Sequence, residues 1–452
     1  MSSENLQADV AIVGAGLSGL SAARALQAAG MRVVVLEARA RVGGRILNES
    51  IAENVVVEVG AQWAGPGQRR LIALADELGV RRFPTYNTGQ NLFELNGRLS
   101  RYRGLIPHIN PAALLDMGQA QLRLERMSKQ VPLEHPWRAE KAAAWDGQTF
   151  WTWIQRNLAT RAGRATMQLA TEAVWAAHPA DLSLLHVLYY AHSAGGLQTL
   201  ISVDGGAQAE RFEGGSQLLP VRMAEALGDA VVLGAPVRRI HQDQAGVRLT
   251  GDDLEVEARR VIVACAPALA GRLVYDPPLP AARDGLTQRF CQGNAIKCMA
   301  WYPEPFWRAD GLTGQANSDR GPVKVTFDNS PPGGTPGVLL GFLEGHQARE
   351  LGAASAQTRR QAVLDCFARY FGPRAASPEG YVEKIWADEE YTRGCYAGYM
   401  PPNGWTDFGH ALRAPVGRVY WAGAETAVEW NGYMDGAITA GERAAREVLA
   451  AE

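Results

Sequence analysis

Apolar and polar positions near the start of the chain change from an extended to a helical pattern. An apolar run at 10–13 ends in Gly14-Ala15-Gly16-Leu17-Ser18-Gly19, and an alanine-rich stretch follows at 20–29. Short β-branched runs favour strands, whereas alanine favours helices. Gly30 is expected to end the helix, and the run at 32–36 predicts a second strand with Glu37 at its end. The chain therefore begins with a predicted βαβ unit.

The rest of the chain alternates between helical and extended segments. A helical region with several tryptophans covers about 110–192, strand-like runs lie within 230–264, and another apolar run covers 294–302. Two strand candidates around Val325 and Leu340 flank a Pro- and Gly-rich loop at 330–337. A strand at 418–421 precedes an amphipathic helix from about 434 to 450. These elements predict an α/β fold.

The chain length of 452 residues allows about three domain-sized units, or two large interleaved domains, at roughly 150 residues each. The pattern favours two domains. We expect the first to comprise residues 1–82, 213–286 and 389–452, and the second to comprise 83–212 and 287–388.

Composition limits the class of partner and the compartment. A net charge of −2 gives no long-range attraction for nucleic acid or an anionic membrane. The five cysteines form no Cys-x-x-Cys pair, and their odd number argues against a complete disulfide framework. The first ten residues do not resemble a secretory signal, and no run of 18 apolar residues occurs. We expect a cytoplasmic protein without a membrane span.

The spacing Gly14-x-Gly16-x-x-Gly19 between a predicted strand and helix is typical of dinucleotide binding. The first glycine permits a tight turn, the second lets the backbone approach a pyrophosphate, and the third lets helix and strand pack closely. The helix amino end then faces the phosphates, and Glu37 lies where a carboxylate can accept from ribose hydroxyls. The alternative is a packing turn with a solvated Glu37.

A second glycine pair extends this motif. Arg39 opens the segment that ends in Gly43-Gly44-Arg45, which adds backbone N–H groups and a guanidinium for the same pyrophosphate. Alone, it would be a basic surface turn. Together with Glu37, it resembles the adenine-dinucleotide signature of FAD enzymes more than that of NAD dehydrogenases, so FAD is the expected cofactor.

The carboxyl-terminal third carries further motifs: Tyr391-Thr392-Arg393-Gly394-Cys395-Tyr396, Trp421-Ala422-Gly423-Ala424-Glu425-Thr426 and Glu429-Trp430-Asn431-Gly432-Tyr433-Met434-Asp435-Gly436-Ala437. With Ala295-Ile296-Lys297-Cys298-Met299, they resemble the flavin-containing monoamine oxidases, and the resemblance runs from about residue 8 to 449. It implies a Rossmann-like FAD domain interleaved with a mixed-sheet and helical substrate domain.

The resemblance also assigns roles to single residues. Cys395 takes the place of the cysteine that a thioether joins to the 8α carbon of the flavin, although Arg393 stands where a glycine is expected. Tyr396 and Tyr433 take the places of the two walls of an aromatic cage, whose ring faces attract amines. Without the resemblance, Cys395 would be interpreted as a buried small hydrophobic residue, and Tyr396 and Tyr433 as core aromatics.

Lys297 is unusual even without the resemblance, because its neighbours are apolar and the chain has only five lysines. An edge-strand lysine that reaches water is the alternative. The matching family lysine holds a water against flavin N5 and assists the reaction with O2.

Further positions follow from the resemblance. The helix that begins near Gly432 is expected to point its amino end at the flavin ring. The remaining cofactor contacts that the resemblance implies are Val237, Trp386, Gly423, Glu425, Thr426 and Met434. The implied substrate cavity contains Trp63, Ile201, Gln208, Val325 and Phe342, with Trp386 near it, and Val325 replaces a bulky aromatic of some relatives.

The expected reaction is oxidation of a primary monoamine, of the arylalkylamine type, to an aldehyde, ammonia and hydrogen peroxide with O2. No metal is needed, and a homodimer is expected because the family is often dimeric. Three alternatives stay open: a diamine or polyamine oxidase, an L-amino-acid oxidase, and a flavin-binding scaffold without turnover. A diamine oxidase needs an acidic group in the cavity, for which the candidates are Asp204, Glu213 and Asp328.

Overall fold

A computed structural model describes residues 4–53, 55–104, 107 and 109–451. Two large sheets organise it. The first has the order β13-β10-β11-β12-β1-β2-β9, with β21 also paired to β12. Its strands are β1 (Glu4–Val13), β2 (Val33–Leu36), β9 (Val231–Val232), β10 (Val237–Gln242), β11 (Val247–Gly251), β12 (Leu254–Val263), β13 (Val274–Asp276) and β21 (Val419–Trp421).

The predicted βαβ unit forms the centre of this first sheet. β1 and β2 are parallel, and α1 (Leu17–Ala28) connects them. The helix ends at Ala29, and Gly30 adopts a φ of +84°, which glycine tolerates best. The apolar residues of α1 and of the carboxyl-terminal helix α16 (Met434–Ala450) share one buried core, so the two ends of the chain pack together.

The second sheet has the order β19-β15-β18-β17-β16-β6-β7. Its strands are β6 (Gln90–Leu95), β7 (Arg98–Tyr102), β15 (Ala295–Tyr302), β16 (Leu312–Ser318), β17 (Val325–Asp328), β18 (Gly337–Glu344) and β19 (Gly380–Ile385). In the antiparallel pair of β15 and β18, Lys297 lies opposite Phe342. Paired residues point to the same sheet face, so these two side chains share a face. The strands predicted around 294–302, Val325 and Leu340 are confirmed.

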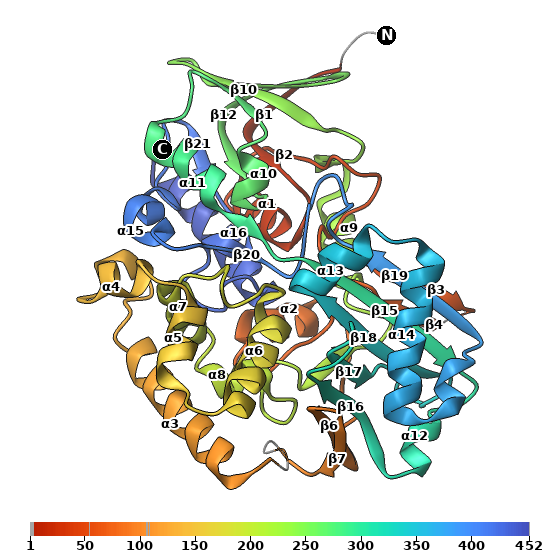
Figure 1. Ribbon diagram of the computed structural model, residues 1–452. Helices are drawn as coiled ribbons and strands as arrows, with labels where there is room; N and C mark the ends of the chain where they lie inside the picture. Colours follow the sequence, from red (N-terminus) through yellow and green to blue (C-terminus); the bar gives the residue numbers. More distant parts are fainter. Residues whose placement is uncertain (1–3, 54, 105–106, 108, 452) are drawn as a thin grey trace.

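The predicted helical region is confirmed as several separate helices, because Pro136, Gly147 and further polar caps interrupt it. Asn110, Thr160 and Ser183 each accept a backbone N–H at a helix amino end. The helices there are α3 (Pro111–Ser128), α4 (Ala142–Asp146), α5 (Phe150–Asn157), α6 (Arg161–Trp175), α7 (Leu184–Ser193) and α8 (Leu197–Ile201). Figure 1 shows them beside the second sheet, with the first sheet above both.

The remaining elements connect these layers. The helices are α2 (Arg69–Glu77), α9 (Leu218–Leu227), α10 (Pro267–Ala270), α11 (Ala281–Arg289), α12 (Phe306–Ala309), α13 (Gly345–Gly352), α14 (Ala356–Phe371) and α15 (Gly404–Phe408). Small two-stranded sheets join β3 (Asn48–Ala52) to β4 (Val55–Glu58), β5 (Arg82–Pro84) to β8 (Glu210–Phe212), and β14 (Cys291–Gln292) to β20 (Gly398–Tyr399). None of the helices in the described part of the chain is both long enough and apolar enough to cross a bilayer.

Candidate active site

A cavity of about 790 Å³ extends between the two large sheets. Its wall includes the glycine turn after β1 at one end, and Lys297 and Phe342 of the second sheet further along. The amino ends of α1 and α16 also line it, through Leu17 and Met434. The cavity is therefore shaped for an elongated cofactor with room for a smaller molecule beside it.

The glycine turn meets the requirements of a bound pyrophosphate. Gly14 has a φ of +103°, which the tight turn requires. Gly16 lines the cavity, and apart from its own chain neighbours no atom of the described protein lies within 4 Å of the place where its Cβ would stand. A Cβ on Gly19 would lie 1.9 Å from the carbonyl oxygen of Gly14, so only glycine lets α1 approach the turn. Gly16 thus leaves space for a ligand, next to the unpaired N–H groups of the helix end.

Glu37 lies at the same end of the cavity as the glycine turn. It is buried at the end of β2, and its carboxylate accepts the N–H of Ala15 at 2.8 Å and the N–H of Arg39 at 3.0 Å. Both Glu37 and Val237 line the cavity here. These backbone contacts hold the carboxylate where it can also accept hydroxyl hydrogens of a ribose.

Arg45 connects the Gly43-Gly44-Arg45 turn to the carboxyl-terminal motifs. Its guanidinium donates to both carboxylate oxygens of Glu425, at 2.5 and 2.9 Å, and to the carbonyl oxygen of Tyr396 at 2.9 Å. Burial opposes ionisation of Glu425, but Arg45 and the N–H of Gly398 hold the pKa of that carboxyl below its ordinary value. Arg45 therefore presents a fixed positive charge at the cavity wall.

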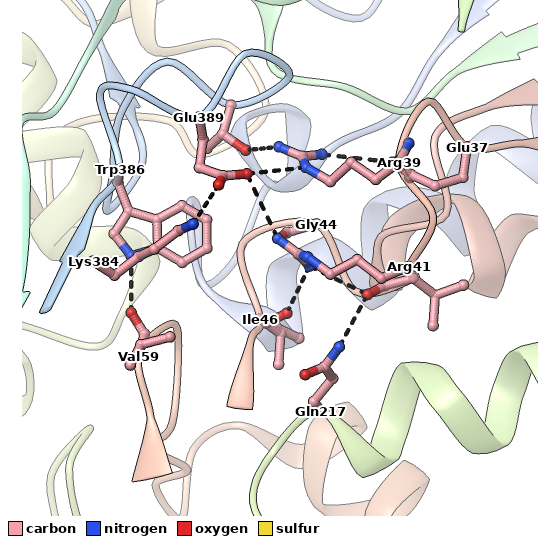
Figure 2. Close-up of polar contacts among 12 residues, drawn as sticks. Glu37, Arg39, Arg41, Gly44, Ile46, Val59, Gln217, Lys384, Trp386 and Glu389 are labelled. Atoms are coloured by element: carbon pink, nitrogen blue, oxygen red, sulfur yellow. Dashed lines mark hydrogen bonds and ion pairs between the residues drawn. The ribbon is translucent and has the colours of Figure 1, made fainter. Parts of the chain in front are cut away.

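A second ionic cluster holds the loop after β19 against the segment 39–45 (Figure 2). The Glu389 carboxylate accepts from Arg39 at 3.1 Å, lies 3.8 Å from Arg41, and bonds to Lys384. Although burial opposes ionisation, Lys384 and Arg39 hold the pKa of Glu389 below its ordinary value. Nearby, the indole N–H of Trp386 donates to the carbonyl oxygen of Val59 at 2.9 Å. The cluster fixes the segment that leads to Cys395.

Lys297 lies on the cavity wall and is only 3% exposed. Its ammonium donates to the carbonyl oxygen of Gly60 at 2.8 Å and to the side chain of Gln62. It also lies 5.6 Å from the ring centroids of Trp63 and Phe342. Burial among these neutral groups lowers the pKa of Lys297 to about 7. The edge-strand alternative is wrong, because β15 lies between β18 and β19.

Aromatic rings form one wall of the cavity. The ring of Phe342 is 5.6 Å from that of Tyr396 and 6.1 Å from that of Trp63, which is itself 4.9 Å from Phe327. Tyr433 also lines the cavity. Burial raises the pKa of Tyr433, and that of Tyr396 still further with the Glu344 carboxyl beside it, so both phenols stay neutral.

Cys395 is buried between these groups and lines the cavity. Burial raises the pKa of its thiol to about 12, against the opposing charges of Arg45 and Lys297. Two residues earlier, Arg393 has a φ of +54°, in the left-handed region that favours glycine. The backbone geometry that a glycine would favour is therefore present with an arginine in its place.

Three of the residues predicted to contact the cofactor are absent from the described cavity wall. Gly19 packs against the turn, Glu425 holds Arg45, and Thr426 bonds to Gly423 and Arg443. The other predicted site residues do line the cavity: Gly14, Gly16, Ser18, Glu37, Arg39, Gly43, Gly44, Arg45, Trp63, Ile201, Gln208, Val237, Lys297, Val325, Phe342, Trp386, Cys395, Tyr396, Gly423, Tyr433 and Met434.

The acidic candidates for binding a second amino group differ in position. Asp204 lines the cavity and is exposed. Glu213 instead pairs with Arg81 at 2.7 Å. Asp328 accepts from Trp307 at 2.8 Å and from Arg308, so neither it nor Glu213 is on the described wall. Sequence reasoning missed a fourth acid, Glu344, which lines the cavity and accepts the hydroxyl hydrogen of Tyr396.

The chain belongs to the flavin containing amine oxidoreductase family, whose model matches residues 17–449. It is therefore an FAD-dependent amine oxidase, of the EC 1.4.3 class, with the α/β fold of mixed sheets that this family shares. The cavity geometry fits this cofactor, since Gly16 leaves open space beside the helix end and Glu37 and Arg45 line the same cavity.

Several relatives match almost the whole chain. AofH of Mycobacterium tuberculosis, which carries an assignment as a flavin-containing monoamine oxidase, is 42% identical over 98% of this chain and 96% of its own length. Amine oxidase B of Sus scrofa is 36% identical over 98% and 86%. The structure of wild-type putrescine oxidase bound to putrescine matches with a TM-score of 0.95 and 37% identity, covering 99% of this chain and 100% of that one.

Proposed function

We propose that this enzyme oxidises a primary monoamine of the arylalkylamine type to an aldehyde, ammonia and hydrogen peroxide, with O2 as oxidant. The observation that carries this proposal is one cavity whose wall brings together the glycine turn, buried Lys297, and the phenols of Tyr396 and Tyr433. FAD, when bound, accepts a hydride equivalent from the carbon that bears the amine nitrogen. The protein's residues bind, orient and desolvate the substrate.

The residues at the glycine end would hold the adenine dinucleotide. Gly14 and Gly16 with the amino end of α1 would bind the pyrophosphate, and Glu37 the ribose. Arg45 would add positive charge beside the phosphates. The amino end of α16 lines the same cavity at Met434, where its partial positive charge would stabilise negative charge on the reduced cofactor.

Cys395 would attach the flavin covalently. Its burial on the cavity wall and its place in the Gly394-Cys395-Tyr396 motif support this assignment. The contacts of Arg45 with the Tyr396 carbonyl and of Glu389 with Arg39 would hold the neighbouring backbone in place.

Tyr396 and Tyr433 would form the cage through which the amine approaches. Two electron-rich ring faces attract an amine and disfavour carboxylates. The rings of Trp63, Phe327 and Phe342 extend the apolar surface beyond Tyr396, which suits an aromatic substituent on the amine. Val325, small at its place on the wall, would leave room for that substituent.

Lys297 would hold a water molecule near the cofactor and assist the reaction with O2. Its lowered pKa means that it can exchange a proton near neutral pH. In Lys297→Met, anaerobic flavin reduction by amine should be preserved better than reoxidation by O2, both measured by stopped-flow absorbance. Equal losses in both half-reactions would contradict the role.

A diamine such as putrescine is the second candidate substrate. The similarity to putrescine oxidase favours it, and exposed Asp204 on the cavity wall could bind the second ammonium. An amino-acid substrate would need a guanidinium for its carboxylate at the aromatic end. The cavity arginines Arg39 and Arg45 are instead engaged by Glu389 and Glu425.

The experiment is a substrate panel with peroxide detection, on purified enzyme that retains its yellow colour. Phenylethylamine should be turned over with higher kcat/KM than putrescine, and phenylalanine should be inert. A preference for putrescine would assign the diamine function, whereas the absence of peroxide with every amine would favour a flavin-binding scaffold.

We also propose two interleaved domains, 1–82, 213–286 and 389–452 against 83–212 and 287–388. The strands of the first large sheet fall within the former ranges and those of the second sheet within the latter, which supports this division.

The expected homodimer is a separate proposal. Exposed Leu115 and Leu122, seven residues apart on one face of α3, support it.

A further inference from the structure

A buried carboxyl group lies beside the phenol of Tyr396. Glu344 is the last residue of β18 and is 2% exposed. Its partner across the strands is Ala295, two residues before Lys297, so Glu344 points to the same sheet face as Lys297 and Phe342. Glu344 Oε1 accepts the Tyr396 hydroxyl hydrogen at 2.7 Å. Glu344 Oε2 is buried and has no hydrogen-bond partner in the described part of the protein.

The charged groups around Glu344 come from three neighbouring segments. Lys324, just before β17, forms a buried ion pair with Glu172 of α6. His178 follows α6, and burial lowers its pKa. Burial raises the pKa of Glu344 to about 7; Glu172 acts in the same direction, while the Tyr396 hydroxyl and Lys324 oppose it. Glu344 is therefore a carboxyl group that exchanges its proton near neutral pH, inside the cavity.

We infer that Glu344 accepts the proton that the substrate ammonium must lose, with the Tyr396 hydroxyl as the bridge. This inference rests on the proposed amine oxidation. One N–H bond of the ammonium breaks, and its proton passes to the phenol oxygen of Tyr396. The phenol's own proton passes to Glu344 Oε1. An ammonium and a carboxylate thus become a neutral amine and a carboxylic acid, and no electrons change centre.

The surroundings favour this transfer. Two opposite charges are costly in an apolar, water-poor site, and the proton transfer removes both. Only the neutral amine has the lone pair that drives hydride loss from the adjacent carbon. Tyr396 is suited to the bridge because the high pKa of its phenol keeps it protonated and donating to Glu344. The amine can therefore arrive as the abundant ammonium and be neutralised next to the cage.

The substitution Glu344→Gln separates this role from a merely structural one. The amide oxygen of glutamine can still accept the hydrogen bond of Tyr396, but an amide does not take up a proton near neutral pH. A structural role would give the same ratio of wild-type to E344Q activity at every pH. A proton-accepting role predicts that the ratio depends on pH.

The test is the pH profile of kcat/KM for phenylethylamine in wild-type holoenzyme and in E344Q, from about pH 6 to about pH 10. Wild-type kcat/KM should rise through about pH 7, where Glu344 ionises, and then level off. E344Q can use only amine that is already neutral in solution. For an amine with a pKa of ~10.4, the neutral fraction at pH 7 is roughly one molecule in 10³. We expect E344Q to be about 10³-fold slower at pH 7, with the deficit closing about tenfold per pH unit.

Two further measurements accompany the profile. Glu172→Gln, which removes a negative charge near Glu344 and outside the described cavity wall, should shift the rise near pH 7 to lower pH. Infrared difference spectra of the holoenzyme across this pH range should show a protonated-carboxyl band in wild type that E344Q lacks.

The assignment of Glu344 would be overturned by any of three results. The ratio of kcat/KM between wild type and E344Q could be the same at every pH, the pH profile of E344Q could match that of the wild type, or Glu172→Gln could leave the rise of kcat/KM near pH 7 at the same pH. In each of these cases wild-type turnover would still support the amine oxidase. If wild-type enzyme oxidised no amine, both proposals would fall together.

Discussion

Replacing Lys297 by methionine should make folding stability respond differently to pH. The side chain is 3% exposed, and burial lowers its pKa to about 7 in the folded protein. In the unfolded chain the pKa of lysine is about 10.4. The folded protein therefore releases the lysine proton at a lower pH than the unfolded chain does.

The sign and size of the effect follow from proton linkage. Between about pH 7 and about pH 10.4 the unfolded chain binds the extra proton, so wild-type stability rises with pH by about 1.36 kcal/mol per unit. Below about pH 7 both states are protonated and the full cost of the buried ammonium is present. Methionine binds no proton. Between about pH 7.5 and pH 9.5, the free energy of unfolding of the wild type should therefore rise by about 2.7 kcal/mol relative to that of Lys297→Met.

Methionine also leaves the Gly60 carbonyl and the Gln62 side chain without their donor. That loss costs about 1–3 kcal/mol for each group but does not depend on pH, so it cancels when the two pH values are compared. The assay is urea unfolding of the holoenzyme followed by tryptophan fluorescence. Lys141→Met, at an exposed position, is the control and should show no change with pH. A stability difference between wild type and Lys297→Met that is equal at both pH values would refute the buried-ammonium account.

Three other predictions concern cofactor and substrate. Cys395→Ala should release its yellow colour into the supernatant on acid precipitation. The wild type should keep the colour in the pellet, and so should the control Cys298→Ala, which changes a buried cysteine of β15 that is not on the described cavity wall. Colour that remains with Cys395→Ala would remove that residue from the attachment. Tyr433→Leu should lower kcat/KM for phenylethylamine roughly tenfold, because it removes one ring face of about 1–2 kcal/mol, without lowering the flavin-to-protein absorbance ratio; unchanged kinetics would count against the cage. Glu389→Gln should weaken the contacts with Arg39 and Lys384 and reduce the flavin content of freshly purified protein, and full flavin content would show that this cluster does not support the cofactor site.

The amino-terminal motif could be predicted from sequence because all of its determinants are local. The turn at Gly14, the open space at Gly16 and the close packing at Gly19 lie within one strand-turn-helix unit, and the structure shows each glycine in the geometry that its position requires. Lys297 was also recognisable, because a lone lysine in an apolar run is unusual whatever packs against it.

The contacts that sequence reasoning missed join residues far apart in the chain. Glu344 ends an apolar strand, which by itself resembles a strand that emerges into water. Its burial and its bond to Tyr396, 52 residues later, exist only when β18 packs against α6 and the loop before β20. Likewise, the motif around Glu425 predicted a direct cofactor contact. In the structure Glu425 is absent from the described cavity wall and instead holds Arg45, 380 residues away.

Anaerobic addition of phenylethylamine to the purified enzyme tests the central claim most directly. The account predicts a yellow protein whose visible flavin absorbance is bleached by the amine and returns when O2 is admitted. A colourless protein that cannot be reconstituted with FAD, or a flavin spectrum that no amine changes, would contradict it.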